Sequence, residues 1–316
     1  MNIELKETPH ATQVAFEDGL YTIDPVTLRL LQESAPLMAQ WSAQECKTKQ
    51  TGGMEEWAKD QDLKDVDACD WYHGTWQYLR LLNMVAVPPW YGRYNESLSG
   101  ILRRKPDANV LISACADYGM LATLHEAITT AEANPAITIY DICRTPLQAC
   151  EWYAGKHGLK ITCVCDNIIT SPRMPLGTYD LIVTDEFLTV LKQEYKPQIV
   201  SRWKELLKPG GTVVTTAMLG GPTNPELREG YGRRAQRLLA QHPDLFPDVV
   251  KPQELIERFV RFAEFHTRHM LAHEDQIRDL FADFELSFSR TVTPGECVNP
   301  TSSFEIVATR PLGPAQ

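Results

Sequence analysis

The chain has 316 residues, of which 43% are hydrophobic and 23% are charged, so it is long enough to bury a substantial core. Its 31 Lys and Arg residues against 41 Asp and Glu residues give a net charge of −10, which argues against general nucleic-acid binding. No apolar run approaches the roughly 20 residues of a membrane-spanning helix, and the first ten residues do not resemble a secretory signal. We therefore expect a cytoplasmic globular protein that binds neither nucleic acid nor membrane.

Residues 1–100 precede the first predicted strand of the main sheet and contain helical stretches such as 25–44 and 75–85. Helical periodicity in this segment predicts an N-terminal helical cap. Residues 101–316 then form the main domain.

Aromatic side chains are concentrated in residues 71–94 of this cap. Ring faces attract cations, so we expect Tyr72, Trp76 and Tyr94 to contribute to a substrate site. The alternative is that the rings only pack the cap onto the main domain. His73 lies in the same cluster and is a candidate proton acceptor, although a hydrogen-bonded structural histidine is an equally open interpretation.

From residue 109 onward, β-rich runs alternate with helical stretches. Five of these runs are predicted strands of one sheet: 109–115, 137–142, 161–167, 179–185 and 211–218. Because they are apolar almost throughout, they indicate a parallel sheet covered by helices on both faces. Two further strand-like runs, 284–292 and 303–310, are joined by a short loop and should pair as an antiparallel hairpin.

Small or polar residues lie at or just after the ends of four predicted strands: Ala114, Cys115, Asp117, Gly119, Asp141, Asp166, Asn167 and Asp185, with the apolar Ile142 next to Asp141. The carboxyl ends of parallel strands form the ligand crevice of an open α/β sheet. Small side chains such as Ala114 and Cys115 allow the backbone to approach a ligand closely. An acid in the position of Asp141 is placed to accept hydrogen bonds from ribose hydroxyls.

These features resemble the class I S-adenosylmethionine (SAM)-dependent methyltransferases over about residues 105–218 and 283–310. The resemblance also includes the helix that ends Leu-Leu-Lys-Pro-Gly-Gly before the fifth strand. It implies an α/β fold with a mostly parallel, seven-stranded Rossmann-like sheet, an antiparallel terminal hairpin and helical caps. It also implies that SAM is the cofactor.

The resemblance assigns parts of the cofactor to particular residues. It places the loop with Ala114, Cys115, Asp117 and Gly119 at the amino-acid end of SAM, Asp141 and Ile142 at the ribose, Asp166 and Asn167 at the adenine, and Asp185 near the transferable carbon. The chain departs from the family's acidic residue and GxGxG motif. Ile112 holds the acidic position, and Ala114 and Ala116 replace two glycines, so Asp117 is a candidate for the missing acid.

Residues 219–284 form an insertion between the fifth and sixth strands. After Pro252 the periodicity predicts one long helix, with His266, His269 and His273 on its apolar face. Three interpretations of these histidines are open: hydrogen-bonded core residues, residues that line a pocket, or metal ligands. We expect His266 and His269 to contact the substrate. The eight cysteines lack the CxxC…CxxC spacing of a zinc framework, so we expect no metal site and no disulfides.

The sequence therefore predicts methyl transfer from SAM to a small-molecule metabolite, in a pocket enclosed by residues 1–100 and 219–284. His73 and Asp185 are the expected catalytic residues, and the expected role is in small-molecule biosynthesis. The first alternative is a cyclase that consumes SAM and releases methylthioadenosine, as in azetidine-2-carboxylate synthases. The others are a nonenzymatic partner subunit with the same fold and an NAD(P)-dependent oxidoreductase.

Overall fold

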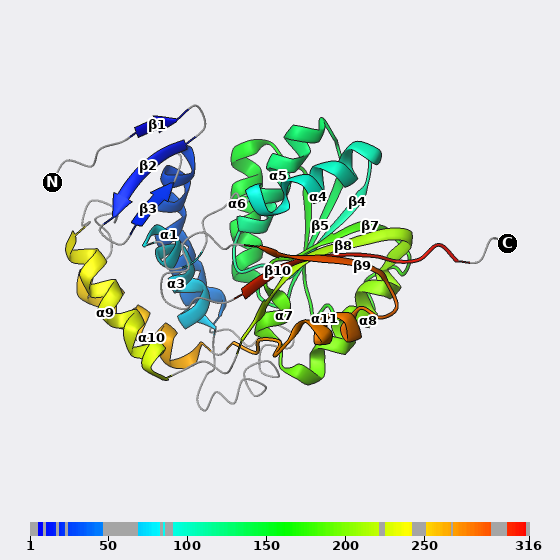
Figure 1. The fold of residues 1–316 in the computed structure, drawn as a ribbon. Helices are drawn as coiled ribbons and strands as arrows, with labels where there is room; N and C mark the ends of the chain where they lie inside the picture. The colour runs from blue at the N-terminus through cyan, green and yellow to red at the C-terminus, as the bar shows by residue number, and fades with distance from the viewer. Residues whose placement is uncertain are drawn as a thin grey trace.

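The computed structural model describes residues 6–8, 11–16, 19–22, 25–46, 69–82, 85, 91–220, 225–241, 251–266, 268–291 and 302–313. They form a seven-stranded central sheet with helices on both faces and a separate three-stranded sheet near the N-terminus (Figure 1).

The central sheet has the strand order β6-β5-β4-β7-β8-β10-β9. Its strands are β4 (Asn109–Ser113), β5 (Ala136–Asp141), β6 (Ile161–Cys165), β7 (Tyr179–Val183), β8 (Leu207–Leu219), β9 (Glu285–Thr291) and β10 (Ser302–Thr309). The first five of these pair in parallel, whereas β10 pairs antiparallel with both β8 and β9. The predicted fold class, a mostly parallel seven-stranded sheet with an antiparallel terminal hairpin, is confirmed.

The two faces of the sheet enter two separate cores. Val110 and Ile112 of β4 belong to one core, whereas Leu111 between them belongs to the other, as the two-residue period of a strand requires. The covering helices are α4 (Tyr91–Arg104), α5 (Gly119–Ala131), α6 (Arg144–His157), α7 (Phe187–Val190) and α8 (Lys196–Leu206), with the short 3-10 turn η1 (Gln193–Tyr195). Burial on both faces explains why these strands are apolar almost throughout.

The N-terminal segment differs from the helical cap predicted for residues 1–100. It begins with the antiparallel strands β1 (Lys6–Thr8), β2 (Ala11–Phe16) and β3 (Gly19–Thr22), and continues with α1 (Pro25–Glu45) and α3 (Asp70–Leu81). Strands of three to six residues are too short for a clear alternating pattern, which is why the sequence did not indicate them. α4 begins before residue 100 but packs on α5, β8 and β10, as part of the main domain.

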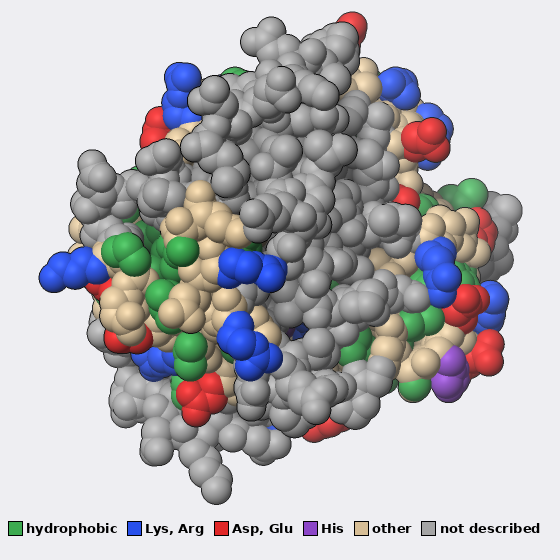
Figure 2. Space-filling model, turned by 60° about the vertical axis from the view of Figure 1, so that its left-hand side comes forward, with side chains coloured by type: hydrophobic (Ala, Val, Ile, Leu, Met, Phe, Trp, Pro, Cys, Tyr) green, Lys and Arg blue, Asp and Glu red, His purple; other side chains and the backbone are tan. Residues whose placement is uncertain are grey.

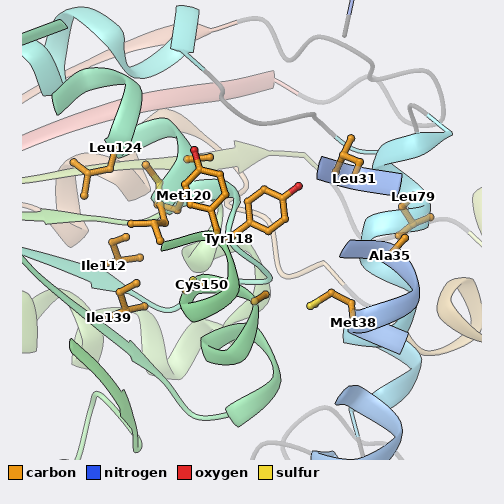
Figure 3. Close-up of a cluster of buried hydrophobic side chains, with 14 of the residues drawn as sticks. Leu31, Ala35, Met38, Leu79, Ile112, Tyr118, Met120, Leu124, Ile139 and Cys150 are labelled. Carbon is orange, nitrogen blue, oxygen red and sulfur yellow. The ribbon is translucent and has the colours of Figure 1, made fainter. Parts of the chain in front are cut away.

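The helices α1 and α3 share one continuous hydrophobic cluster with the main domain. Figure 3 shows Leu31 and Met38 of α1 and Leu79 of α3 on one side of this cluster, with Tyr118 and Cys150 on the other. All five side chains are at most 1% exposed. The N-terminal helices are therefore packed against the edge of the sheet at which the strand-end residues lie.

The insertion contains α9 (Pro225–Gln241), α10 (Pro252–Phe265) and α11 (Glu274–Leu280). The prediction of one long helix after Pro252 is wrong, because the backbone becomes extended at His266, with φ −69° and ψ 112°. The chain then runs beside the end of β8, where the Leu271 N–H donates to the Met218 carbonyl and the Gly220 N–H donates to the Leu271 carbonyl. Amphipathic periodicity does not reveal such pairing with a distant strand.

Among the helices that the structure describes, none is both long enough and apolar enough to span a bilayer. On the described part of one face of the molecule, basic and acidic side chains are interspersed (Figure 2).

Candidate functional site

The parallel strands bring four predicted strand-end segments to one edge of the sheet. β4 is followed by residues 114–118, β5 ends at Asp141, β6 is followed by Asp166, and β7 is followed by Asp185. The Asp166 N–H donates to the Asp141 carbonyl at 3.0 Å, and the Ala114 N–H donates to the Tyr140 carbonyl at 2.8 Å, so neighbouring segments are bonded directly. The candidate cofactor residues therefore lie side by side.

The loop after β4 makes a left-handed turn at Ala114, whose φ is +65°. A non-glycine residue in this region is strained by roughly 1–2 kcal/mol, so surrounding contacts must hold it there. One such contact comes from Cys115, whose N–H donates to Oδ2 of Asp141 at 2.9 Å. The loop with Ala114 and Cys115 thus lies at the carboxyl end of β4, bonded to the residue that ends β5, and its contact with a cofactor stays a prediction.

Asp141 joins this loop to the start of α6. Its Oδ1 accepts the Cys143 N–H at 2.7 Å, while its Oδ2 accepts the Cys115 N–H. Burial raises the pKa of Asp141 to about 7, with a smaller increase from Cys143, although both N–H donors and His73 lower it. Because a carboxylate oxygen has two lone pairs, each Asp141 oxygen can still accept one further hydrogen bond. Ile142 follows directly and packs against a group of buried cysteines.

Asp117 is not available for the cofactor role predicted for it. Its Oδ2 accepts hydrogen bonds from Arg80 Nε at 2.7 Å and Gln77 Nε2 at 2.8 Å. Its Oδ1 accepts them from Arg80 Nη2 at 3.0 Å and the Gly119 N–H at 2.7 Å. Both oxygens are saturated, so no lone pair remains for a cofactor ammonium group. The sequence did not reveal this pair, because Arg80 and Gln77 come from α3.

Gly119 allows the Arg80 guanidinium to approach the N-terminus of α5. A Cβ atom at position 119 would lie 2.6 Å from Arg80 Nη2 and 2.8 Å from Asp117 Oδ1. Gly119 thus leaves space for the Arg80 guanidinium, and its own N–H is one of the four donors to Asp117.

Asp166 and Asn167 shape the turn after β6. Asp166 Oδ2 accepts the Ser171 hydroxyl at 2.7 Å, and its Oδ1 accepts the Asn167 N–H at 2.9 Å. Asn167 Oδ1 accepts the Ile169 N–H at 3.0 Å, which is an Asx-type turn. About one quarter of the Asp166 side chain is exposed. The structure therefore places both residues at the expected edge of the sheet and engages both in local bonds.

Asp185, Tyr94 and Thr216 converge from β7, α4 and β8. Asp185 Oδ1 accepts the Tyr94 hydroxyl at 2.5 Å and the Thr216 hydroxyl at 2.8 Å. Tyr94 is 1% exposed and Thr216 is completely buried, so these bonds fix the carboxylate. The sequence indicated Tyr94 and Asp185 separately, but it did not indicate Thr216. The available signal was the adjacent Thr215 and Thr216 inside the buried second half of β8.

Aromatic rings from α3 and α10 stack together near these acids. The rings of Tyr72 and Trp76 are 4.8 Å apart, those of Phe262 and His266 are 4.7 Å apart, and Tyr72 is 5.8 Å from Phe262. Burial raises the pKa of the Tyr72 phenol above its ordinary range, and the negative charge of Asp117 raises it further. The Tyr72 ring thus lies within the electrostatic reach of the strand-end carboxylates Asp117, Asp141 and Asp185, and its role as a substrate residue stays a prediction.

His73 lies among cysteine side chains. Its Nδ1 is 3.6 Å from Cys46 Sγ, and its ring packs edge-on against Tyr72 at 5.2 Å. Burial, the largest single influence, lowers the pKa of His73, but Cys143, Asp141 and Asp117 together raise it, so the net pKa is above the ordinary value. The structure thus brings His73 together with thiols, whereas the other predicted catalytic residue, Asp185, is bonded to Tyr94 and Thr216.

The three histidines of the insertion do not share a helix face. His266 ends α10 and stacks on Phe262, so it belongs to the aromatic stack. The His269 backbone donates to the Thr189 carbonyl at 2.7 Å, and its own carbonyl accepts Lys196 Nζ at 2.7 Å. His273 is exposed and precedes α11. The break in the helix thus separates residues that the periodicity had placed together.

No family model and no curated protein sequence matches this chain. Solved structures that are similar to it include SAM-dependent methyltransferases. One, from Methanosarcina mazei, is 19% identical over 66% of this chain and 94% of its own, with a TM-score of 0.46.

A phosphoethanolamine N-methyltransferase from Haemonchus contortus, in complex with phosphomonomethylethanolamine and S-adenosylhomocysteine, is also similar. It is 12% identical over 75% of this chain and 57% of its own, with a TM-score of 0.47. The magnesium protoporphyrin IX methyltransferase of Synechocystis, with bound S-adenosylhomocysteine, is 15% identical over 68% of this chain and 81% of its own, with a TM-score of 0.40.

Proposed function

We propose that this chain is a SAM-dependent methyltransferase that acts on a small-molecule metabolite. The observation that carries the proposal is the position of Asp141, at the end of the second parallel strand of a β6-β5-β4-β7-β8-β10-β9 sheet. Its buried carboxylate bonds the loops after β4 and β5 and retains one lone pair on each oxygen. This is the place and the acceptor capacity that a nucleoside ribose requires.

Further features of the described residues fit SAM. The Trp76 Nε1 and Thr184 Oγ1 atoms are buried and have no hydrogen-bond partner within the described part of the chain. Buried polar groups of this kind are costly unless a ligand or water pairs with them. The stacked rings of Tyr72 and Trp76 provide faces that attract a cation such as a sulfonium.

When bound, SAM supplies a methyl group on a positively charged sulfur, which is already a strong electrophile. Asp141 would then hold the ribose, and Asp166 and Asn167 would contribute to the adenine site. Tyr94 and Thr216 orient Asp185, whose carboxylate we assign to holding the acceptor and receiving its proton. The N-terminal helices and the insertion exclude water from this edge of the sheet.

One observation favours a second candidate, cyclisation of SAM itself. Within residues 114–118 the carboxylate of Asp117 is saturated by its donors and cannot bind the ammonium group of SAM. An amino group not held by that acid is free to lose a proton and attack the side-chain γ-carbon. The γ-carbon–sulfur bond then breaks, giving azetidine-2-carboxylate and methylthioadenosine.

Product analysis with purified protein distinguishes these candidates. S-adenosylhomocysteine that forms only when a metabolite extract is added supports methyl transfer, and methylthioadenosine that forms from SAM alone supports cyclisation. Binding of SAM without turnover in any extract indicates the nonenzymatic subunit. Stabilisation by NAD(P) but not by SAM would contradict the proposal and support the oxidoreductase.

A further inference from the structure

Four potential metal ligands lie together beneath the N-terminal helices, outside the groups that the proposed reaction uses. Cys46, Cys69, His73 and Cys143 are all buried, and their ligand atoms all lie within 4.8 Å of one another. Cys46 follows α1, Cys69 precedes α3, His73 lies in the first turn of α3, and Cys143 precedes α6. Three elements that are distant in the sequence thus contribute to one cluster.

The spacing of these atoms matches a tetrahedral metal site. The Sγ atom of Cys143 is 3.7 Å from that of Cys46 and 3.5 Å from that of Cys69, and Cys46 Sγ is 3.6 Å from His73 Nδ1. Around a zinc ion with Zn–S bonds of about 2.3 Å and a Zn–N bond of about 2.0 Å, two sulfurs are about 3.8 Å apart and a sulfur and a nitrogen about 3.5 Å apart. A disulfide requires about 2.0 Å and would leave the third thiol unpaired.

The surroundings favour thiolates. Cys69 and Cys143 occupy the N-cap positions of α3 and α6, where the partial positive charge of a helix terminus stabilises an anion. The Thr145 hydroxyl oxygen is 3.3 Å from Cys46 Sγ and can donate to it, as partners of ligating atoms commonly do. Three buried thiolates without a cation would be strongly destabilising, since a buried charge must be paired.

We propose that Cys46, Cys69, His73 and Cys143 bind one structural zinc ion. A set of three cysteines and one histidine is a common closed zinc site, and all four side chains are at most 6% exposed, which leaves no open position for a substrate. In this arrangement His73 is a ligand rather than the catalytic base expected from the sequence. The ion ties α1 and α3 to the loop after β5, so that it holds the N-terminal helices on the main domain.

Metal analysis of the protein as purified, without added metal or chelator, tests this proposal. We expect about one zinc ion per chain, and after replacement by Co²⁺ the visible absorption of a tetrahedral site with thiolate ligands. Zinc well below stoichiometry, iron in its place, or a disulfide between any of these cysteines in unreduced peptides would overturn the proposal.

Substitutions at position 73 separate metal binding from a merely structural role. His73→Ala should leave less than about 0.2 zinc per chain after dialysis, whereas His73→Cys supplies a fourth thiolate and should keep the ion. Cys163→Ser is the matched control, because its thiol lies outside the cluster and contacts the Leu147 carbonyl. Full zinc retention by a folded His73→Ala protein would contradict the assignment of His73, and zinc loss in Cys163→Ser would contradict the assignment of the cluster.

Discussion

Cys143 donates its backbone N–H to the carboxylate of Asp141 at 2.7 Å, so the proposed ribose-binding acid and a proposed zinc ligand share one turn. The zinc site therefore holds the turn that orients Asp141. Zinc removal by a chelator should weaken binding of S-adenosylhomocysteine by about 10-fold or more, the size of effect that partners of ligating residues show. Calorimetric titration before and after zinc is restored measures the change. Equal affinity in zinc-free, folded protein would contradict this coupling.

Above about pH 8, where the Asp141 carboxyl with its pKa of about 7 is ionised, Asp141→Asn should weaken cofactor binding by roughly 10- to 100-fold, because hydrogen bonds to a charged group contribute about 1.5–3 kcal/mol. Equilibrium dialysis with labelled SAM provides the measurement. Asp107→Asn is the control, because Asp107 is an exposed acid that precedes β4, at the opposite edge of the sheet. Equal loss in both variants would show that the effect comes from net charge rather than from the ribose contact.

The buried ion pair of Arg80 and Asp117 should be important for stability. Arg80→Met leaves a buried carboxylate without its cation and should lower the free energy of unfolding by about 3–5 kcal/mol. The exposed pair of Lys156 and Glu33 joins α6 to another N-terminal helix, α1, so Glu33→Gln is a matched control with an expected change of at most about 1 kcal/mol. Urea unfolding measures the free energy of unfolding of both variants. Similar losses in Arg80→Met and Glu33→Gln would contradict the larger contribution of the buried pair.

Gly119→Ala should destabilise the protein by about 1–3 kcal/mol, because the new methyl group would overlap an ion pair that cannot move freely. A methyl group at Gly155 in α6 would meet no atom within 4 Å, so Gly155→Ala should instead stabilise the helix by about 0.5–1 kcal/mol. Thermal unfolding of both variants tests these opposite signs. A Gly119→Ala protein as stable as the wild type would contradict this prediction, because Arg80 would then move away from the methyl group at no cost in stability.

Lys196 should make stability depend on alkaline pH. Its ammonium group donates to the carbonyls of Leu188, Leu191 and His269, and burial lowers its pKa from 10.5 to about 8. Between pH 8 and 10.5 the unfolded chain retains a proton that the folded chain has lost, so this group raises the free energy of unfolding as pH rises.

The contribution of Lys196 is at most about 1.4 kcal/mol per pH unit, and it is absent from Lys196→Met. The unfolding free energy of the wild type, minus that of this variant, should therefore increase between about pH 8 and pH 10. Urea unfolding at several pH values measures it, and a constant difference would contradict the lowered pKa.

Local patterns were sufficient for the sheet but not for the insertion. Strands buried on both faces are apolar almost throughout, and this property is visible in the sequence without knowledge of the neighbours. The path of the chain after Phe265 depends instead on hydrogen bonds to β8, so a helical pattern that continues through His266 was misleading.

The candidate site was likewise predictable only where local patterns determine it. The position of Asp141 and Asp185 at one edge of the sheet followed from the strand ends, whereas the side chains that saturate Asp117 come from the helix α3. The four proposed zinc ligands span residues 46 to 143, and only the CxxxH spacing of Cys69 and His73 is local. Two ligands separated by four positions lie on one face of a helix, and this was the one signal that could have been recognised.

The sequence by itself determined the mostly parallel sheet and the edge at which its polar residues collect, because both follow from the burial of each segment and its chain order. Only the tertiary structure decided what those polar residues bind. Arg80 meets Asp117, and Cys46 meets Cys143, across separations that no periodicity records. Hydrogen bonding and metal binding act over a few ångströms in space, whatever the distance along the chain.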